Sequence, residues 1–273
     1  MENSLTPKIE FLYIVPTYQC NLKCPHCDIR SKKDNFDRIS FLKTLSNYKN
    51  VPAVIFGGEP TLYPDRIQMI CDCGNVESIS TNLINLNDEL INLIKNNQLS
   101  IATSWNPNRF NGTQYDTWVK NLSVLAKNNL SAKLLITLTQ DLIEYDINDL
   151  ISKFEQWSST GGLTDIQFEP LLDYSKNQQF YDAVDQWLFD IDQKWSNNIV
   201  SNHIVHQLKN WKFNCSATYT LQPNGMLTRG CPQDTGMRIN TQCFNCYYSA
   251  VCQPCRLQQY CTFPKKLYQK YYE

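Results

Sequence analysis

The stretch Glu10-Phe-Leu-Tyr-Ile-Val15 is a short apolar run, and Val51-Pro-Ala-Val-Ile-Phe56 is a second one that ends at Gly57 and Gly58. Between them, residues 36–48 repeat apolar side chains at helical spacing. Short apolar runs separated by a helical pattern predict two parallel strands that are joined by a crossover helix. The same alternation continues along the chain and decides the fold that we expect.

Four more strands and four more helices are expected downstream. The predicted strands are residues 76–80, 99–105, 133–139 and 165–172, and the predicted helices are residues 88–96, 115–127, 147–157 and 179–195. Residues 65–71 are only weakly periodic. Six strand–helix units are too few for a complete eight-stranded barrel, so we predict an α/β fold with a partial, TIM-like (β/α)6 barrel. In such folds the chemistry lies at the carboxyl ends of the strands.

The composition excludes several classes of protein. The 273 residues include 25 Lys and Arg and 26 Asp and Glu, a formal net charge of -1, which gives no electrostatic reason for a nucleic-acid partner. An apolar content of 42% is enough to fill a core and excludes wholesale disorder. No apolar run approaches the roughly 18 residues of a membrane span, and the first residues lack the pattern of a secretory signal. We therefore expect a cytoplasmic protein without a membrane partner.

The 12 cysteines are clustered towards the two ends of the chain. Five lie between residues 20 and 73, and seven lie between residues 215 and 261. A disulfide scaffold is typical of a short secreted chain, whereas the long cysteine-free middle of this chain has an α/β pattern. Ligation of a metal or an iron–sulfur cluster in a reducing compartment therefore explains these cysteines better.

Three cysteines follow the first predicted strand, in Cys20-Asn-Leu-Lys-Cys24-Pro-His-Cys27. Three thiolates on a four-iron cluster leave one iron without a protein ligand, and that iron can hold a small molecule. The alternative is a zinc site, which usually takes a fourth ligand, and His26 lies between two of the cysteines. The residues by themselves leave both alternatives open.

The spacing Cys20-x3-Cys24-x2-Cys27 after the first strand resembles the signature of radical S-adenosylmethionine (SAM) enzymes. Gly57-Gly-Glu-Pro60 after the second strand resembles the GGEP motif of the same family. The resemblance covers residues 8–198. It implies a four-iron cluster whose unique iron binds SAM, and cleavage of SAM by one electron to methionine and a 5′-deoxyadenosyl radical. That radical then abstracts a hydrogen atom from the substrate.

The resemblance also implies residues that contact SAM. Glu59 is expected to accept a hydrogen bond from the ammonium group of SAM, and the two glycines to keep side chains out of its way. His26 matches the position of an aromatic residue near the adenine. The expected cofactor-binding set is His26, Gly57, Gly58, Glu59, Pro60, Ser80, Thr81, Asn82 and Ser104. The last four end the third and fourth predicted strands, where polar residues also serve as ordinary caps.

The second cysteine set resembles the seven-cysteine SPASM domain that follows some radical SAM barrels. It reads Cys215, Gly225 and Cys231, then Cys243-x2-Cys246-x5-Cys252-x2-Cys255-x5-Cys261, with a predicted hairpin at Pro223-Asn-Gly225. The gaps after Gly225 and between Cys252 and Cys255 depart from the family pattern. The resemblance implies two auxiliary clusters, one on Cys215, Cys231 and Cys255 and one on Cys243, Cys246, Cys252 and Cys261. With the SAM-binding cluster this makes three 4Fe-4S clusters. Zinc knuckles are the alternative, because Cys243-x2-Cys246 is also a zinc-like spacing.

We therefore expect a radical SAM barrel in residues 1–200, a helical connector in residues 201–214 and an auxiliary-cluster domain in residues 215–273. Cys71 and Cys73 stay unassigned. The candidate catalytic residues are Glu169 and Tyr174, near the end of the sixth predicted strand, and Asp234, close to Cys231.

The leading hypothesis is an oxidoreductase that oxidises or crosslinks a ribosomally made peptide, because the resemblance implies a peptide substrate. Few residues precede the first strand, so a separate leader-recognition protein is an expected partner, and a flavodoxin or ferredoxin is the expected electron donor. A radical SAM dehydrogenase of a sugar or aminocyclitol is an alternative, as is a non-catalytic zinc or iron–sulfur protein. A sulfatase-activating oxidase ranks lower, because Pro232 stands where those relatives carry Asp.

Overall fold

The computed structural model describes residues 9–27, 29, 32–170, 177–195, 218–229, 266 and 269–270. The chain divides into two compact units. The first consists of residues 1–23, 27–101 and 214–234, and the second of residues 24–26, 102–213 and 235–273. Strand β4 (Ser100–Ser104) lies where the two units divide.

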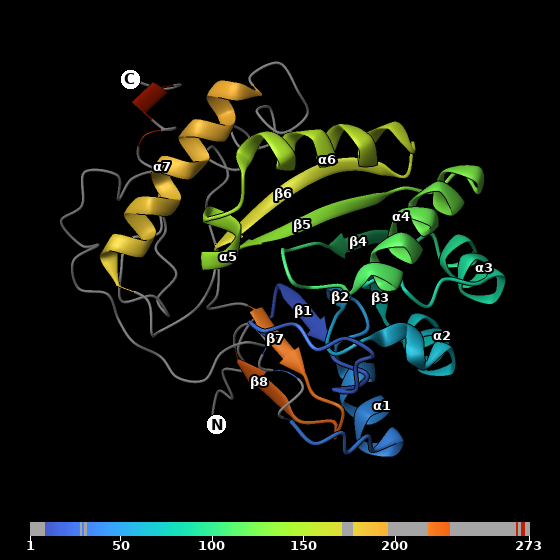
Figure 1. Ribbon diagram of the computed structural model, residues 1–273. Coiled ribbons are helices and arrows are strands. Elements are labelled where there is room, and N and C mark those ends of the chain that lie inside the picture. Colours follow the sequence, from blue (N-terminus) through green and yellow to red (C-terminus); the bar gives the residue numbers. More distant parts are fainter. Residues whose placement is uncertain are drawn as a thin grey trace. The chain divides into compact units, whose positions relative to one another are not determined.

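Parallel strands separated by helices form the first unit (Figure 1). In chain order its elements are β1 (Phe11–Ile14), α1 (Arg38–Asn47), β2 (Pro52–Ile55), the 3-10 turn η2 (Pro60–Leu62), α2 (Pro64–Cys73), β3 (Asn75–Ser80) and α3 (Asp88–Asn96). β2 pairs in parallel with β1 and with β3. The apolar runs therefore form parallel strands as predicted, and each predicted strand is confirmed to within two residues at its ends.

The helices of this unit follow their caps and their apolar faces. The Asn87 side chain accepts the backbone N–H of Leu90 at the start of α3, and the four apolar residues of that helix are buried. Helix α2 is longer than its weak periodicity indicated. It begins with Pro64, whose ring fixes a helical φ, and Asp65 lies in its first turn.

The predicted hairpin is confirmed, and it extends the sheet of the first unit. β7 (Thr218–Leu221) and β8 (Leu227–Arg229) are antiparallel, and β7 also pairs in parallel with β1. Gly225 in the turn has a φ of +80°, and a Cβ on it would lie 2.4 Å from the backbone carbon of Ser40 on α1. Only glycine fits this turn against the helix, and Thr44 Oγ1 donates to the Gly225 carbonyl at 2.8 Å. The boundaries expected at residues 200 and 214 stay a prediction, because they lie outside the described residues.

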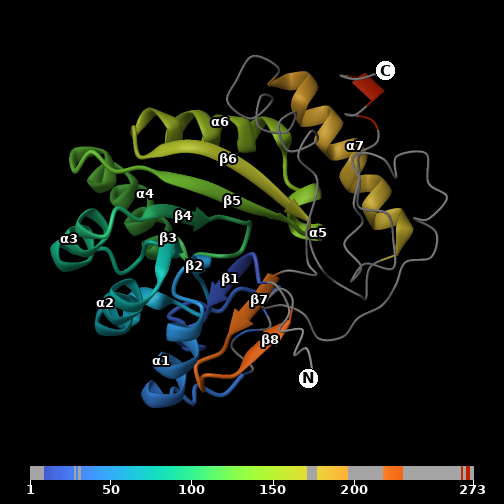
Figure 2. The same ribbon diagram turned by 180° about the vertical axis from the view of Figure 1, so that it is seen from behind.

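The second unit contains α4 (Gly112–Lys127), β5 (Ala132–Leu138), the short helix α5 (Gln140–Ile143), α6 (Ile147–Ser159), β6 (Leu163–Pro170) and α7 (Gln178–Lys194). β5 and β6 pair in parallel, and α6 runs along β6 in both views (Figures 1 and 2). Its core is aromatic, with Trp118, Phe154, Trp157 and Phe168 almost fully buried. Within the described ranges, no helix combines the length and the apolarity that crossing a membrane requires.

Candidate functional site

The two sequence motifs of the first unit are joined directly by backbone hydrogen bonds. Pairing between the exits of β1 and β2 continues beyond the strands: the Gly58 N–H donates to the Thr17 carbonyl at 3.0 Å, and the Glu59 N–H donates to the Gln19 carbonyl at 2.7 Å. Gln19 immediately precedes Cys20. The start of the cysteine loop and the Gly-Gly-Glu-Pro segment therefore lie side by side at the carboxyl ends of adjacent parallel strands, where such folds place their chemistry.

This junction explains the two glycines in a different way from the one expected. A Cβ on Gly58 would lie 2.1 Å from the carbonyl oxygen of Gln19, and a Cβ on Gly57 would lie 2.7 Å from the carbonyl oxygen of Thr17. Gly57 also has a φ of +140°, which side chains rarely allow. The glycines let the chain's own backbone approach, and any closeness to a cofactor remains a prediction.

Glu59 is the centre of a buried polar network. Its side chain is 1% exposed, and its carboxylate accepts four hydrogen bonds. Oε1 accepts from the N–H and the hydroxyl of Thr61 and from the hydroxyl of Thr81, and Oε2 accepts from the N–H of Asn82 at 2.7 Å. The carboxylate thus ties the end of β2 to the end of β3. Its expected contact with a ligand ammonium group stays a prediction.

Asn82 carries this network on to the cysteine loop. Its side-chain amide donates to Oδ1 of Asn21 at 2.6 Å and lies 4.0 Å from the sulfur of Cys20. Asn82 and Thr81 are both buried. Besides their bonds to Glu59, the Thr81 hydroxyl accepts the N–H of Leu83 and Oδ1 of Asn82 accepts the N–H of Ile84. Asn82 therefore positions the loop, and Thr81 supports the Glu59 carboxylate.

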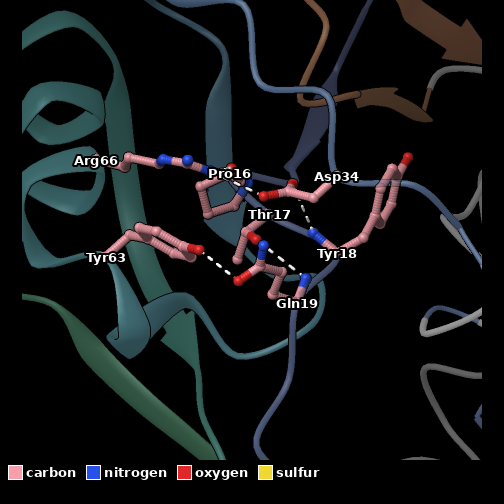
Figure 3. A network of polar contacts seen from close by, with 7 residues as sticks. All are labelled: Pro16, Thr17, Tyr18, Gln19, Asp34, Tyr63 and Arg66. Atoms are coloured by element: carbon pink, nitrogen blue, oxygen red, sulfur yellow. Dashed lines mark hydrogen bonds and ion pairs between the residues drawn. The ribbon is translucent and has the colours of Figure 1, made fainter.

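A second polar network fixes the other side of the loop (Figure 3). Arg66, on α2, donates to the Pro16 carbonyl at 2.7 Å and lies 3.5 Å from Oδ2 of Asp34, whose Oδ1 accepts the N–H of Tyr18. The guanidinium also lies between two aromatic rings, 4.0 Å from the centre of Phe36 and 3.9 Å from that of Tyr63. A planar cation held on both faces is a rigid anchor for the segment after β1.

The tyrosines around this network have distinct roles. Tyr63 donates a short hydrogen bond to Oε1 of Gln19, the residue just before the first cysteine. Burial, with a smaller contribution from the Asp34 charge, raises the pKa of Tyr18 above its usual value. Tyr18 therefore stays neutral at physiological pH.

The three cysteines of the loop differ in their surroundings. Cys20 is exposed, Cys24 is buried, Cys27 is half-buried, and none of them is in a disulfide. The N–H of Leu22 donates to the sulfur of Cys20 at 3.4 Å, and Cys27 packs against a cluster of Val15, Tyr18 and Ile29. Backbone donors to sulfur favour the thiolate form, which is the form that ligates a cluster.

The donor set of this loop fits a four-iron cluster with one open iron. No three described His, Cys, Asp and Glu side chains lie close enough together to hold a single metal ion. In a four-iron cluster each thiolate binds a different iron, so the sulfurs stand further apart than around one ion. Cys20, Cys24 and Cys27 are the residues of the described loop that would hold such a cluster.

The remaining predicted site residues are only partly described. His26 and Ser104 are half-buried in the second unit, and Ser80 is half-buried at the end of β3. Glu169 lies near the end of β6, beside Thr137 of β5. The residues that lie outside the described part of the chain are Tyr174, Asp234, Cys215, Cys231, Cys243, Cys246, Cys252, Cys255 and Cys261.

Sequence reasoning missed the residues that hold the loop. Arg66 and Asp34 belong to no motif, and Asn21 is one of the unspecified positions between Cys20 and Cys24. Arg66 lies in the segment with the weakest periodicity. The one usable signal was Pro64 followed by Asp65, which is typical of a helix start. That signal predicts α2 but not the partners of its arginine, which come from distant parts of the chain.

Comparison with solved structures supports the same architecture. Streptococcus suis SuiB bound to S-adenosylmethionine aligns over 92% of this chain and 74% of its own, with a TM-score of 0.63 and 13% identity. This chain shares the fold of SuiB. SuiB bound to its precursor peptide SuiA aligns over 92% of this chain and 72% of its own, with a TM-score of 0.59 and 12% identity. The expected α/β fold class is therefore confirmed. No protein-family model matches the chain, and no curated protein matches its sequence.

Proposed function

We propose that this chain is a radical SAM enzyme that oxidises or crosslinks a ribosomally made peptide. The observation that carries the proposal is the junction between the cysteine loop and the Gly-Gly-Glu-Pro segment, through the Gly58–Thr17 and Glu59–Gln19 hydrogen bonds. It joins the two motifs of the resemblance at one edge of a parallel sheet, in a chain with the fold of SuiB.

In this proposal the chain's own residues would hold the cluster and orient its ligating loop. Cys20, Cys24 and Cys27 hold the cluster, and Asn82 and Glu59 fix the first of these cysteines from the side of β3. When bound, the cluster supplies an electron that cleaves SAM and generates the oxidising radical. The loop must also exclude water, which the buried Cys24 and the apolar contacts of Cys27 support.

The peptide substrate rests on the likeness to SuiB, which has been seen with a precursor peptide. The two auxiliary clusters, the leader-recognition protein and the flavodoxin or ferredoxin donor belong to the same proposal. Glu169 and Tyr174 remain its candidate catalytic groups facing the substrate, and Asp234 remains its candidate proton acceptor.

The first test compares two sets of cysteine substitutions in the full chain. After anaerobic reconstitution with iron and sulfide, the wild-type chain should hold about twelve iron atoms, as three clusters require. The triple variant Cys20→Ala, Cys24→Ala, Cys27→Ala should hold about eight and should release no 5′-deoxyadenosine from SAM with dithionite. The double variant Cys71→Ala, Cys73→Ala is the control and should keep both the iron and the cleavage.

Cleavage without iron loss in the triple variant would contradict the assignment of the cluster. A chain that binds zinc and no iron would favour the non-catalytic alternative. The substrate is tested by incubation with SAM, dithionite and any small peptide found to be encoded beside the chain's gene. Loss of a pair of hydrogen atoms from the peptide supports the proposal, whereas oxidation of a sugar or aminocyclitol with an unchanged peptide favours the alcohol dehydrogenase.

A further inference from the structure

A pocket of about 280 Å³ in the second unit belongs to no motif of the sequence. Its lining residues come from the loop that follows β4, the start of α4, the segment between α5 and α6, and the helix α6. Trp105 and Asn106 are buried at its floor, and Asn108, Asn111 and Gly112 are exposed at its mouth. This volume is just below the range of pockets that hold a whole small-molecule ligand, and it suits one large side chain.

The lining contains four aromatic side chains, those of Trp105, Phe110, Tyr115 and Tyr145, and all but Phe110 form a rigid apolar wall. The Trp105 ring meets the Tyr145 ring edge-on, with centres 5.8 Å apart, and it packs against Trp157 of α6 at 5.0 Å. The indole N–H of Trp157 donates to the Tyr115 hydroxyl at 3.0 Å. These contacts hold Trp105, Tyr115 and Tyr145 in place before a ligand arrives, which lowers the entropic cost of binding.

At the end of β4, the wall residue Trp105 and the predicted cofactor residue Ser104 lie on opposite sides of the strand. The Trp105 N–H donates to the Leu135 carbonyl at 3.2 Å, so the strand pattern of alternating sides extends to Trp105. Thr103 accepts the indole N–H of Trp118, which places Thr103, and with it Trp105, on the side of helix α4. Ser104, the predicted cofactor residue between them, points to the opposite side.

The lining of the pocket carries one charged side chain, Lys153 of α6. Its ammonium group lies 5.5 Å from the centre of the Tyr115 ring and 3.9 Å from Oδ2 of Asp149. The same Asp149 oxygen accepts a hydrogen bond from the Tyr145 hydroxyl, so Tyr145 and Lys153 share this carboxylate. An ammonium group has three donors, and a half-buried lysine beside a ring can serve a further carboxylate.

We propose that this pocket anchors an aromatic residue of the peptide substrate that has a carboxylate beside it. The aromatic ring would stack among Trp105, Tyr115 and Tyr145, and the carboxylate would meet Lys153. A neutral sugar could stack on the same rings but would leave the lysine charge unused. The peptide nature of the ligand rests on the proposed function.

Two short peptides test the class of ligand in the full chain. Acetyl-Gly-Tyr-Glu-Gly-amide is the probe, acetyl-Gly-Leu-Gln-Gly-amide is its control, and binding is measured by ligand-observed NMR titration without SAM or reductant. Burial of the aromatic ring should make the probe bind about ten-fold more tightly than the control. Equal affinities would overturn the assignment of an aromatic ligand.

The location of the binding site is tested by placing a large side chain at the mouth of the pocket. A Cβ on Gly112 meets no atom within 4 Å, so Gly112→Trp places an indole at the pocket mouth without a backbone clash. The variant Thr113→Trp adds the same side chain at the next, exposed position of α4, which does not line the pocket. We expect Gly112→Trp to weaken probe binding about ten-fold and Thr113→Trp to change it less than about two-fold. Equal effects of the two variants would overturn the location.

The contact between Lys153 and a carboxylate is tested by comparing a charged and an uncharged probe peptide. Lys153→Met should weaken binding of the Glu-containing probe about three-fold, as expected for a partly exposed ion pair, and leave a Tyr-Gln version of it unchanged. An equal effect on both peptides would overturn the carboxylate contact. These titrations need no SAM cleavage. Absence of probe binding therefore overturns the pocket alone, whereas absence of 5′-deoxyadenosine overturns the proposed function and leaves only the binding of the probe peptide standing.

Discussion

Replacement of Glu59 by Gln tests whether this residue holds the site together or contacts the cofactor. All four partners of the carboxylate are hydrogen-bond donors, and two of them are backbone N–H groups, those of Thr61 and Asn82. A glutamine has one acceptor oxygen and one NH2 group that only donates. In either orientation its NH2 group therefore faces one of these backbone N–H groups, while the threonine hydroxyls can rotate to accept.

The cost follows from this count. A buried N–H without a partner costs about 1–3 kcal/mol, and the remaining bonds lose the assistance of the negative charge. Because the side chain is 1% exposed, water cannot replace the lost acceptor. We expect Glu59→Gln to lower the free energy of unfolding by about 2–4 kcal/mol.

Urea unfolding of the full chain, followed by circular dichroism under reducing conditions, measures this change. The matched control is Glu77→Gln on β3, where the carboxylate is exposed, and it should stay within about 0.5 kcal/mol of the wild type. Equal stability of the two variants would refute the buried network. A Glu59→Gln chain that is fully stable but binds SAM poorly would instead support the direct cofactor contact.

Three further perturbations test the junction, the anchor and the leftover thiols. Gly58→Ala sets a Cβ 2.1 Å from Gln19 O and should lower the free energy of unfolding by about 2–4 kcal/mol, while Gly112→Ala, which meets open space, should not; equal urea midpoints would contradict the close approach. Arg66→Lys keeps the charge but loses the planar group between two rings, so we expect a loss of about 1–2 kcal/mol in the same assay, and an unchanged midpoint would argue against the anchor. Burial, together with the neighbouring Asp72 charge, raises the pKa of the Cys71 thiol from 9.0 to about 11. Between these pH values the unfolded thiol is ionised and the folded one is protonated, so stability should fall as the pH rises, and Cys71→Ser should remove that part of the fall. Identical pH profiles of wild type and Cys71→Ser would show that this thiol makes no contribution.

Strands β1 and β2 were predictable because each is a short apolar run bounded by polar or turn residues, and burial in a parallel sheet requires little else. Helix α3 was predictable for the same reason, since its apolar face and its capping Asn87 are adjacent in sequence. Helix α2 was underestimated, because part of its packing is made by Arg66 between two rings rather than by an apolar stripe. The periodicity of apolar residues in the sequence detects only an apolar stripe, not packing of this kind.

The candidate site also has features that the sequence predicted and features that it did not. The cysteine spacing and the Gly-Gly-Glu-Pro segment are visible in the sequence, and the strand pattern predicts that both lie at the carboxyl edge of the sheet. The sequence suggested that Glu59 serves a ligand. The structure gives its carboxylate four protein donors: two from Thr61, two residues further along the chain, and two from Thr81 and Asn82, which no local pattern connects to it.

The sequence by itself determined the alternation of strands and helices, the hairpin at Pro223-Asn-Gly225 and the position of the cysteine loop directly after a strand. These depend on neighbours along the chain, where side-chain periodicity and turn residues act over a few positions. Only the tertiary structure decided that the hairpin pairs with β1, that Gly58 is pressed against Gln19, and that Trp105, Tyr115 and Tyr145 enclose a pocket. Each of these joins residues that are distant in sequence, and their contacts arise from packing, which a linear pattern does not encode.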